Sequence, residues 1–212
     1  MGPWQGEGIA IDLAALRTEF LARGFNDYEA SASNTRKDRL LNAAMHRICE
    51  REPWPFLITT TTGNSPLTIS DLRAVLSVVD TTNRRQLDPE DIRTIREADP
   101  TLAVTGPPEC WYQSAATIIG CWPTTVTALS VRYIKVAADL SLSTDSPVIP
   151  TRYHEVIVDG ACAMAYRARN NVEMAEACRT AFEEGILQMS DSLLGIQYDA
   201  TMGIVVSGSN DW

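Results

Sequence analysis

Towards the end of the chain, the hydrophobic pattern predicts two α-helices joined by a short turn. Apolar and small residues recur at helical spacing on one side of each helix, and Asn170 and Asn171 separate the two. Thr151 is a candidate N-cap for the first helix. The first apolar stripe comprises Tyr153, Ile157, Ala161, Met164, Ala165 and Ala168, and the second comprises Met174, Cys178, Phe182, Ile186, Met189 and Leu193. We therefore predict a helical hairpin over residues 150–194.

Two further helical patterns come first in the chain, within residues 10–52. The first covers residues 10–23, with leucine and phenylalanine on one side and a glycine as its stop. The second begins at Asn34 or Thr35 and ends before Pro53, which disfavours helix at the residue before it. These two helices and the hairpin predict a helical bundle.

The pattern between the helices is β-rich, over residues 54–136. Short β-branched runs bounded by proline and glycine predict strands. The predicted strands are residues 56–62, 72–79, 110–121 and 125–136, the last two joined by a turn at residues 122–124. Apolar and polar residues alternate over residues 127–134, which favours a half-buried antiparallel strand. We predict a small antiparallel β-rich insertion in the helical bundle.

A short helix is predicted inside this insertion, over residues 88–99. Asp88 is its candidate cap and Pro89 its first residue. The fold class is therefore α+β, with a single domain over residues 1–194. Residues 195–212 form an extended tail, because their glycine-interrupted sequence has too few apolar residues for a core.

The net charge is −9, from 27 acidic and 18 basic residues. Such a chain repels phosphates, which argues against a dedicated DNA-binding module. The negative charge is, however, compatible with a surface past which DNA slides without binding. The N-terminus lacks the basic and apolar regions of a signal peptide, and no apolar run approaches the ~18 residues of a membrane span. We expect no membrane partner and synthesis in the cytoplasm.

The candidate chemistry of the chain is sparse. The five cysteines contain no CxxC pair and are interpreted as reduced, buried small apolar residues. His46 and Cys49 lie one helical turn apart, but a zinc site needs further ligands that the spacing does not supply. A Cys–His hydrolase could use one of the cysteines with His46 or His154, but the sequence places no cysteine at a strained turn or a helix N-terminus, where a nucleophile would be expected. We therefore expect no catalytic residue, no cofactor-binding residue, no metal and no enzyme activity.

Charged positions gather on two of the predicted helices. Glu173, Glu176, Glu183 and Glu184 lie on the last helix, and Arg36, Lys37, Arg39, Arg47 and Arg51 lie on the second. Ordinary solvation accounts for both sets, and a partner surface or a belt of salt bridges between subunits is the alternative. Trp54, Trp111 and Trp122 are similarly open to a packing role or an interface role.

Four stretches of the chain, in this order, resemble the head-to-tail adaptor or head-completion proteins of tailed bacteriophages. They are "RICEREPWPF" at residues 47–56, "PPECWYQ" at residues 107–113 leading into "IIGCWPTT", "LSVRYIKVAADLSLSTDSPVIPTRYHEVIVDGACAMAYRAR" at residues 129–169, and the acidic closing helix. Together they span most of residues 35–194.

The resemblance implies a dodecameric ring docked on the portal protein, joined to a downstream tail or neck protein and located in the virion neck. Double-stranded DNA would pass through the ring without sequence-specific binding. By position, the tail would contact the portal through Ile196, Tyr198, Met202, Ile204, Val205, Val206 and Trp212. Contacts between subunits are expected at Arg36, Arg39, Arg47, Gly160, Ala161, Glu176 and Glu183.

Three other functions stay open from the sequence. The chain could be a neck or tail-completion ring further from the portal. It could also be a non-viral helical module that binds peptides without forming a ring, or a small hydrolase.

Overall fold

The computed structural model describes residues 12–25 and 31–195, and its α+β fold confirms the predicted class. The chain divides into two compact units. The helical unit comprises residues 1–56 and 137–212, and the β unit comprises residues 57–136. The β unit is therefore an insertion between the second and third long helices, as the order of patterns predicts.

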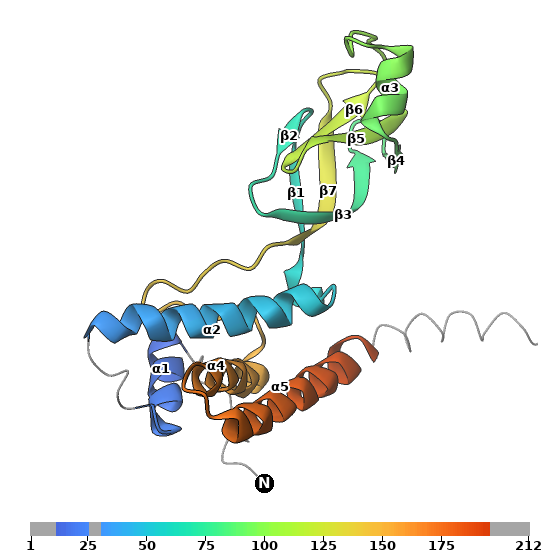
Figure 1. The fold of residues 1–212 in the computed structure, drawn as a ribbon. Coiled ribbons are helices and arrows are strands. Elements are labelled where there is room, and N and C mark those ends of the chain that lie inside the picture. The colour runs from blue at the N-terminus through green and yellow to red at the C-terminus, as the bar shows by residue number, and fades with distance from the viewer. Residues whose placement is uncertain (1–11, 26–30, 196–212) are drawn as a thin grey trace, which may run out of the picture. The chain divides into compact units, whose positions relative to one another are not determined.

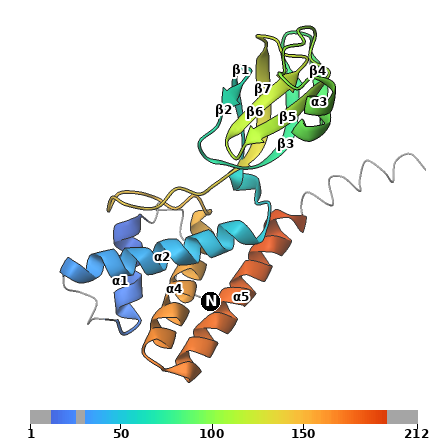
Figure 2. The same cartoon turned by 45° about the horizontal axis from the view of Figure 1, so that its top comes forward.

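Helix α4 is the centre of the helical unit, and α1, α2 and α5 all contact it (Figures 1 and 2). The elements are α1 (Leu13–Ala22), α2 (Ser31–Arg51), the short 3-10 helix η3 (Thr151–Tyr153), α4 (His154–Ala168) and α5 (Val172–Leu193). A further 3-10 turn, η2 (Pro55–Leu57), follows α2. The C-terminal helical hairpin is thus confirmed.

The turn of the hairpin also forms where the sequence predicts it. Asn170 has a φ of 58°, in the left-handed region that asparagine tolerates better than most residues. The Asn171 side chain then accepts a hydrogen bond from Met174 N at 3.2 Å and caps α5.

Two helix starts differ from the prediction. Helix α2 begins at Ser31, before the predicted start. Thr151 makes no side-chain cap, because it opens η3, where Tyr153 N donates to Pro150 O at 2.9 Å. The helix proper therefore starts at His154, three residues later than the candidate cap.

The β unit is one seven-stranded sheet that is nearly closed as a barrel. Its strands are β1 (Ile58–Asn64), β2 (Leu67–Thr68), β3 (Leu72–Asp80), β4 (Arg85–Pro89), β5 (Cys110–Ala115), β6 (Ile118–Trp122) and β7 (Ala128–Lys135), in the order β1-β7-β3-β4-β5-β6-β2. The pair β4–β5 is parallel and the other pairs are antiparallel. The sheet is therefore mixed rather than purely antiparallel as predicted.

The predicted strand over residues 110–121 is wrong, because this stretch is the hairpin of β5 and β6. The turn at residues 122–124 does not join neighbouring strands either. Strand β6 lies between β5 and β2, whereas β7 lies between β1 and β3. The periodicity of a sequence predicts a strand but not the strand with which it pairs, so only the tertiary structure shows this topology.

The short helix α3 (Ile92–Ala98) begins later than predicted. Asp88 and Pro89 belong to the end of β4, where they pair with the start of β5. Asp91 is the actual cap, and its carboxylate accepts a hydrogen bond from Arg93 N at 2.8 Å. Strand pairing thus overrides a local helix-start signal.

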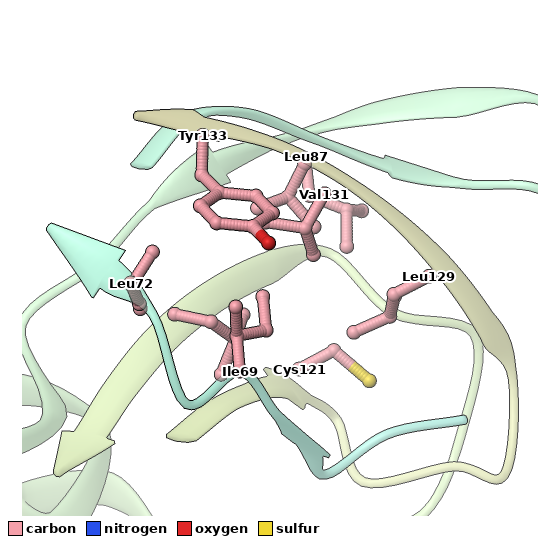
Figure 3. Packing of buried hydrophobic residues seen from close by; sticks show 9 residues of the cluster. Ile69, Leu72, Leu87, Cys121, Leu129, Val131 and Tyr133 are labelled. Carbon is pink, nitrogen blue, oxygen red and sulfur yellow. The ribbon is translucent and has the colours of Figure 1, made fainter. Parts of the chain in front are cut away.

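The core of the β unit is built by side chains from several strands that point into one interior (Figure 3). Leu129, Val131 and Tyr133 of β7 are buried there and Arg132 is exposed, so the predicted alternation is confirmed over residues 129–133, whereas Ile134 is buried as well. The cluster comprises Ile69, Leu72, Val78, Leu87, Ile119, Cys121, Leu129, Val131 and Tyr133. Each such aliphatic side chain contributes about 1.5–3 kcal/mol by burial.

Candidate interaction surfaces

Helices α2, α4 and α5 of the helical unit come close together at Gly160 of α4. A Cβ atom there would lie 2.7 Å from Phe182 Cε2 of α5 and 3.0 Å from Ala44 Cβ of α2. The neighbouring Ala161 is fully buried. A similar approach occurs at Gly185 of α5, where a Cβ would lie 2.6 Å from Val156 Cγ2 of α4. The small residues therefore close the bundle within one chain.

An arginine at the end of α1 ties this helix to α4. Arg23 forms ion pairs with Asp159, with Glu155 at 2.9 Å and with Glu19 at 3.4 Å. Burial raises the pKa of the Asp159 carboxyl, although the Arg23 charge opposes this. The Tyr166 hydroxyl also donates to Arg23 O at 3.1 Å. Charge pairing and a backbone hydrogen bond thus fasten α1 to α4.

Residues 137–149 form a strap that leads into the hairpin and is bonded to the first two helices. Asn42 of α2 makes two hydrogen bonds with the Leu140 backbone, at 2.8 and 3.0 Å. His46 Nε2 lies 2.6 Å from Asp139 Oδ1. The amide of Leu13, the first residue of α1, donates a hydrogen bond to the Asp145 carbonyl of the strap at 2.8 Å. The strap therefore satisfies groups that a free helix end would leave unpaired.

The exposed side of α2 is basic. Arg36, Arg39 and Arg47 are exposed there, and Leu40 and Ala43 are half-buried between them. These three arginines are predicted intersubunit residues, and the structure places them together on one face of one helix.

The exposed side of α5 is acidic. Glu173 and Glu184 are exposed, and Leu187 is 60% exposed between acidic residues. Two other glutamates pair within the chain. Glu176 contacts Arg179 at 2.6 Å, and Glu183 contacts Arg51 of α2 at 3.0 Å.

The predicted site residues thus fall into three groups. The arginines and glutamates above lie on accessible faces, whereas the chain's own helices cover Gly160 and Ala161. The predicted portal residues Ile196, Tyr198, Met202, Ile204, Val205, Val206 and Trp212 lie outside the described residues.

Sequence reasoning missed Arg23 and Asp159, which are 136 positions apart. One signal for Asp159 was available: it is a carboxylate among the apolar positions of α4. A buried charge at such a position requires a partner. The sequence alone does not identify that partner.

Trp54 has a packing role in the structure, and Trp122 makes a hydrogen bond within the β unit. Trp54 is fully buried and donates from Nε1 to Ile48 O at 2.6 Å. Trp122 Nε1 donates to Asp99 Oδ2 at 3.2 Å.

The candidate reactive groups lie in unreactive surroundings. Burial raises the pKa of the Cys162 thiol to about 12 and also raises the pKa of Cys110 and Cys178, which disfavours their thiolates. His154 is buried, with Nε2 2.8 Å from Ile149 O. Within residues 12–25 and 31–195, no group of three or more His, Cys, Asp or Glu side chains could hold a metal ion.

No helix in the described part of the chain is long and apolar enough to cross a membrane. A comparison with curated proteins found no match. The SU10 adaptor protein family, in contrast, matches residues 11–204, which is nearly the whole chain. The chain therefore belongs to the SU10 adaptor protein family, a family of phage head-to-tail adaptors.

Proposed function

We propose that this chain is a structural virion protein that forms a ring below the portal, joins head to tail and continues the DNA channel. The observation that carries this proposal is the family match over residues 11–204. Its partners are the portal protein, a downstream tail or neck protein, and copies of itself in a dodecameric ring. It is made in the host cytoplasm and resides in the virion neck.

The charge of the chain supports a channel role. At −9, its surface repels the phosphates of passing double-stranded DNA, so the genome moves without sequence-specific binding. The proposed role needs no catalytic residue and no cofactor. The raised thiol pKa values of Cys110, Cys162 and Cys178 support this part of the proposal.

The two compact units suit different tasks within the ring. We assign ring formation to the helical unit and contacts with neighbours or tail components to the β unit, within one adaptor domain over residues 1–194. Residues 195–212 reach the portal as an extended tail, and their apolar residues provide the contacts.

Electron microscopy of the purified full-length chain, with and without the portal ring of the same virus, tests the proposal. We expect the chain to form rings when the portal is present and to stay monomeric when it is absent. A chain that stays monomeric and ignores the portal would contradict the proposal. Binding to a neck or tail ring instead of the portal would favour the position further from the head.

Deletion of residues 196–212 tests the tail assignment. We expect the shortened chain to fold, because α5 ends at Leu193, and to lose portal binding in a co-sedimentation assay. A matched control replaces the same residues with a glycine-serine tail of equal length. Unchanged portal binding by both variants would refute the tail assignment and leave the ring proposal standing.

A further inference from the structure

Strand β1 has one edge without a partner strand. It stands at one end of the sheet and pairs with β7 alone, from Ile58↔Ile134 to Asn64↔Ala128 without a register shift (Figure 1). The part of the chain that the structure describes contains no hydrogen bond to the opposite edge of β1. We call this opposite edge the outer edge of β1.

Two hydrogen bonds show which backbone groups of β1 face the outer edge. Ser65 N donates to Thr127 O at 3.1 Å, whereas Ala128 O accepts from Thr81 N on the β3 side at 2.9 Å. Because alternate residues of an antiparallel strand bond to its partner, the odd-numbered residues of β1 bond to β7. The even-numbered residues turn their N–H and C=O groups to the outer edge, and they are Ile58, Thr60, Thr62 and Asn64.

The outer edge lacks the features that keep exposed strands from pairing. Exposed edges in natural sheets are commonly short, charged, bulged or interrupted by proline. The other end of the sheet follows this rule, because β2 has two residues and comes directly after Pro66. Strand β1 has seven residues with no charge, no proline and no bulge, and four of them are threonines, which favour extended backbone. The outer edge is therefore suited to an added strand.

The side chains beside the outer edge indicate the chemistry of the added strand. Thr60 and Thr62 are exposed, and β-branched residues pair well with threonine across two strands. Arg132 of β7 is exposed and lies opposite Thr60, at two strand spacings or about 10 Å from the added strand. Arg132 has no ion-pair partner among the described residues, so a glutamate at that level of the added strand could pair with it.

We propose that an extended segment of the downstream tail or neck protein adds to the outer edge of β1 as a further strand. This segment has mostly uncharged β-branched residues and one acidic residue near Arg132. A second copy of β1 does not fit, because β1 has no acidic residue and two identical edges would pair about a two-fold axis, which closes a dimer rather than a ring. The inference rests on the proposed function, which assigns contacts with tail components to the β unit.

Two variants of the full-length chain test the added strand. Thr62→Pro removes one N–H group from the outer edge and leaves the hydrogen bonds to β7 in place, and Arg132→Glu reverses the charge beside the edge. As matched controls, Thr62→Val keeps the N–H group, and Arg93→Glu makes the same charge change at an exposed position of α3. Each chain is assembled on the portal ring of the same virus and titrated with the purified downstream tail or neck protein of that virus.

Thr62→Pro should bind the tail or neck protein at least about tenfold more weakly, because the added strand loses hydrogen bonds at the middle of the edge. Arg132→Glu should bind at least about threefold more weakly, because its carboxylate repels the acidic residue of the added strand. Both controls should bind normally, and all four variants should still bind the portal. Cooperative urea unfolding shows that each variant is folded.

Hydrogen exchange tests the contact in the unchanged chain, without a substitution. On the portal ring alone, the amides of Thr60 and Thr62 should exchange at least about tenfold faster than those of Thr59 and Thr61, which bond to β7. Addition of the tail or neck protein should slow the exchange of Thr60 and Thr62 and leave that of Thr59 and Thr61 unchanged.

Three results would overturn the contact. Slow exchange of Thr60 and Thr62 before the tail or neck protein is added would mean that the edge is already covered. If deletion of residues 196–212 then restored fast exchange, the edge would belong to the tail of another copy. Normal binding by folded Thr62→Pro and Arg132→Glu would place the tail or neck protein elsewhere and leave the ring function intact. An unchanged chain that ignores the portal, yet gains this protection from the tail or neck protein, would overturn the proposed ring and support the added strand.

Discussion

Arg23 and Asp159 are 136 positions apart in the chain and form an ion pair that joins the end of α1 to α4. The Arg23 side chain is 25% exposed and that of Asp159 is 13% exposed, so water screens the pair only in part. Since the Asp159 carboxylate is otherwise buried, the arginine matters most as the group that keeps this charge compensated.

Replacing Arg23 with glutamine should therefore destabilise the helical unit. The substitution leaves Asp159 buried without its cation, and we expect a loss of about 2 kcal/mol, between the values for exposed and buried pairs. Urea unfolding followed by circular dichroism measures the change. As a control, Arg179→Gln removes a pair whose side chains are both more than half exposed, so water screens it and its loss should have a much smaller effect on stability. Equal effects of the two substitutions would contradict the role of Asp159 burial.

Gly160→Ala should also destabilise the helical unit, although alanine is the better helix former. The added methyl would meet the Phe182 ring at 2.7 Å, and such overpacking costs about 1–3 kcal/mol against a helix-propensity gain of about 1 kcal/mol. Gly195→Ala is the matched control, because nothing lies within 4 Å of a Cβ there. Thermal unfolding of both variants measures the change in stability. A Gly160→Ala variant more stable than the unchanged chain would contradict the prediction and would mean that α5 can shift to accommodate the methyl group.

The β unit should lose stability in acid through Asp80. Burial alone would raise the pKa of this carboxyl, but hydrogen bonds from Thr127, Asn83 and the backbone of Thr82 outweigh burial and lower it below 3.8. The unfolded chain therefore takes up the proton first. The stability that Asp80 provides is complete well above pH 3.8 and is lost as the pH falls through the lower pKa of the folded state.

Urea unfolding at a series of pH values between about 3 and 7 measures this loss of stability in acid. Asp80→Asn should reduce the stability at neutral pH and flatten the acid part of the profile. The exposed Asp88 offers a control in Asp88→Asn, which should leave the profile unchanged. An identical acid slope in the Asp80 variant would exclude the assignment.

His154 should make the helical unit sensitive to mildly acidic conditions. Burial lowers its pKa from 6.5, although the hydrogen bond to Ile149 O opposes the shift. Below pH 6.5 the unfolded chain binds a proton that the folded chain does not, so stability falls as the pH decreases towards the folded-state value. His154→Gln should weaken this dependence, whereas His46→Gln, a change at a half-exposed histidine, should retain it. Unfolding midpoints of both variants at neutral and mildly acidic pH provide the test.

Local chemistry determined the helical hairpin in advance. Apolar residues at helical spacing specify both helices, and two asparagines supply the left-handed turn and the cap that follows it. The alternation over residues 129–133 of β7 likewise predicted which side chains would be buried, because a strand's two faces alternate in sequence. These features depend on neighbours within a few positions, which is the range over which a sequence pattern carries information.

The tertiary structure decided what depends on distant partners. Asp88 and Pro89 have the local signals of a helix start, yet pairing with β5 makes them the end of a strand and moves the cap to Asp91. The partners of β6 and β7, and the Arg23–Asp159 ion pair, join residues far apart in the chain. The small residues around Gly160 were predicted as a seam between subunits, and the structure fills that space with α2 and α5 of the same chain. Their spacing predicted a close approach, but only the packed helices show which surface makes it.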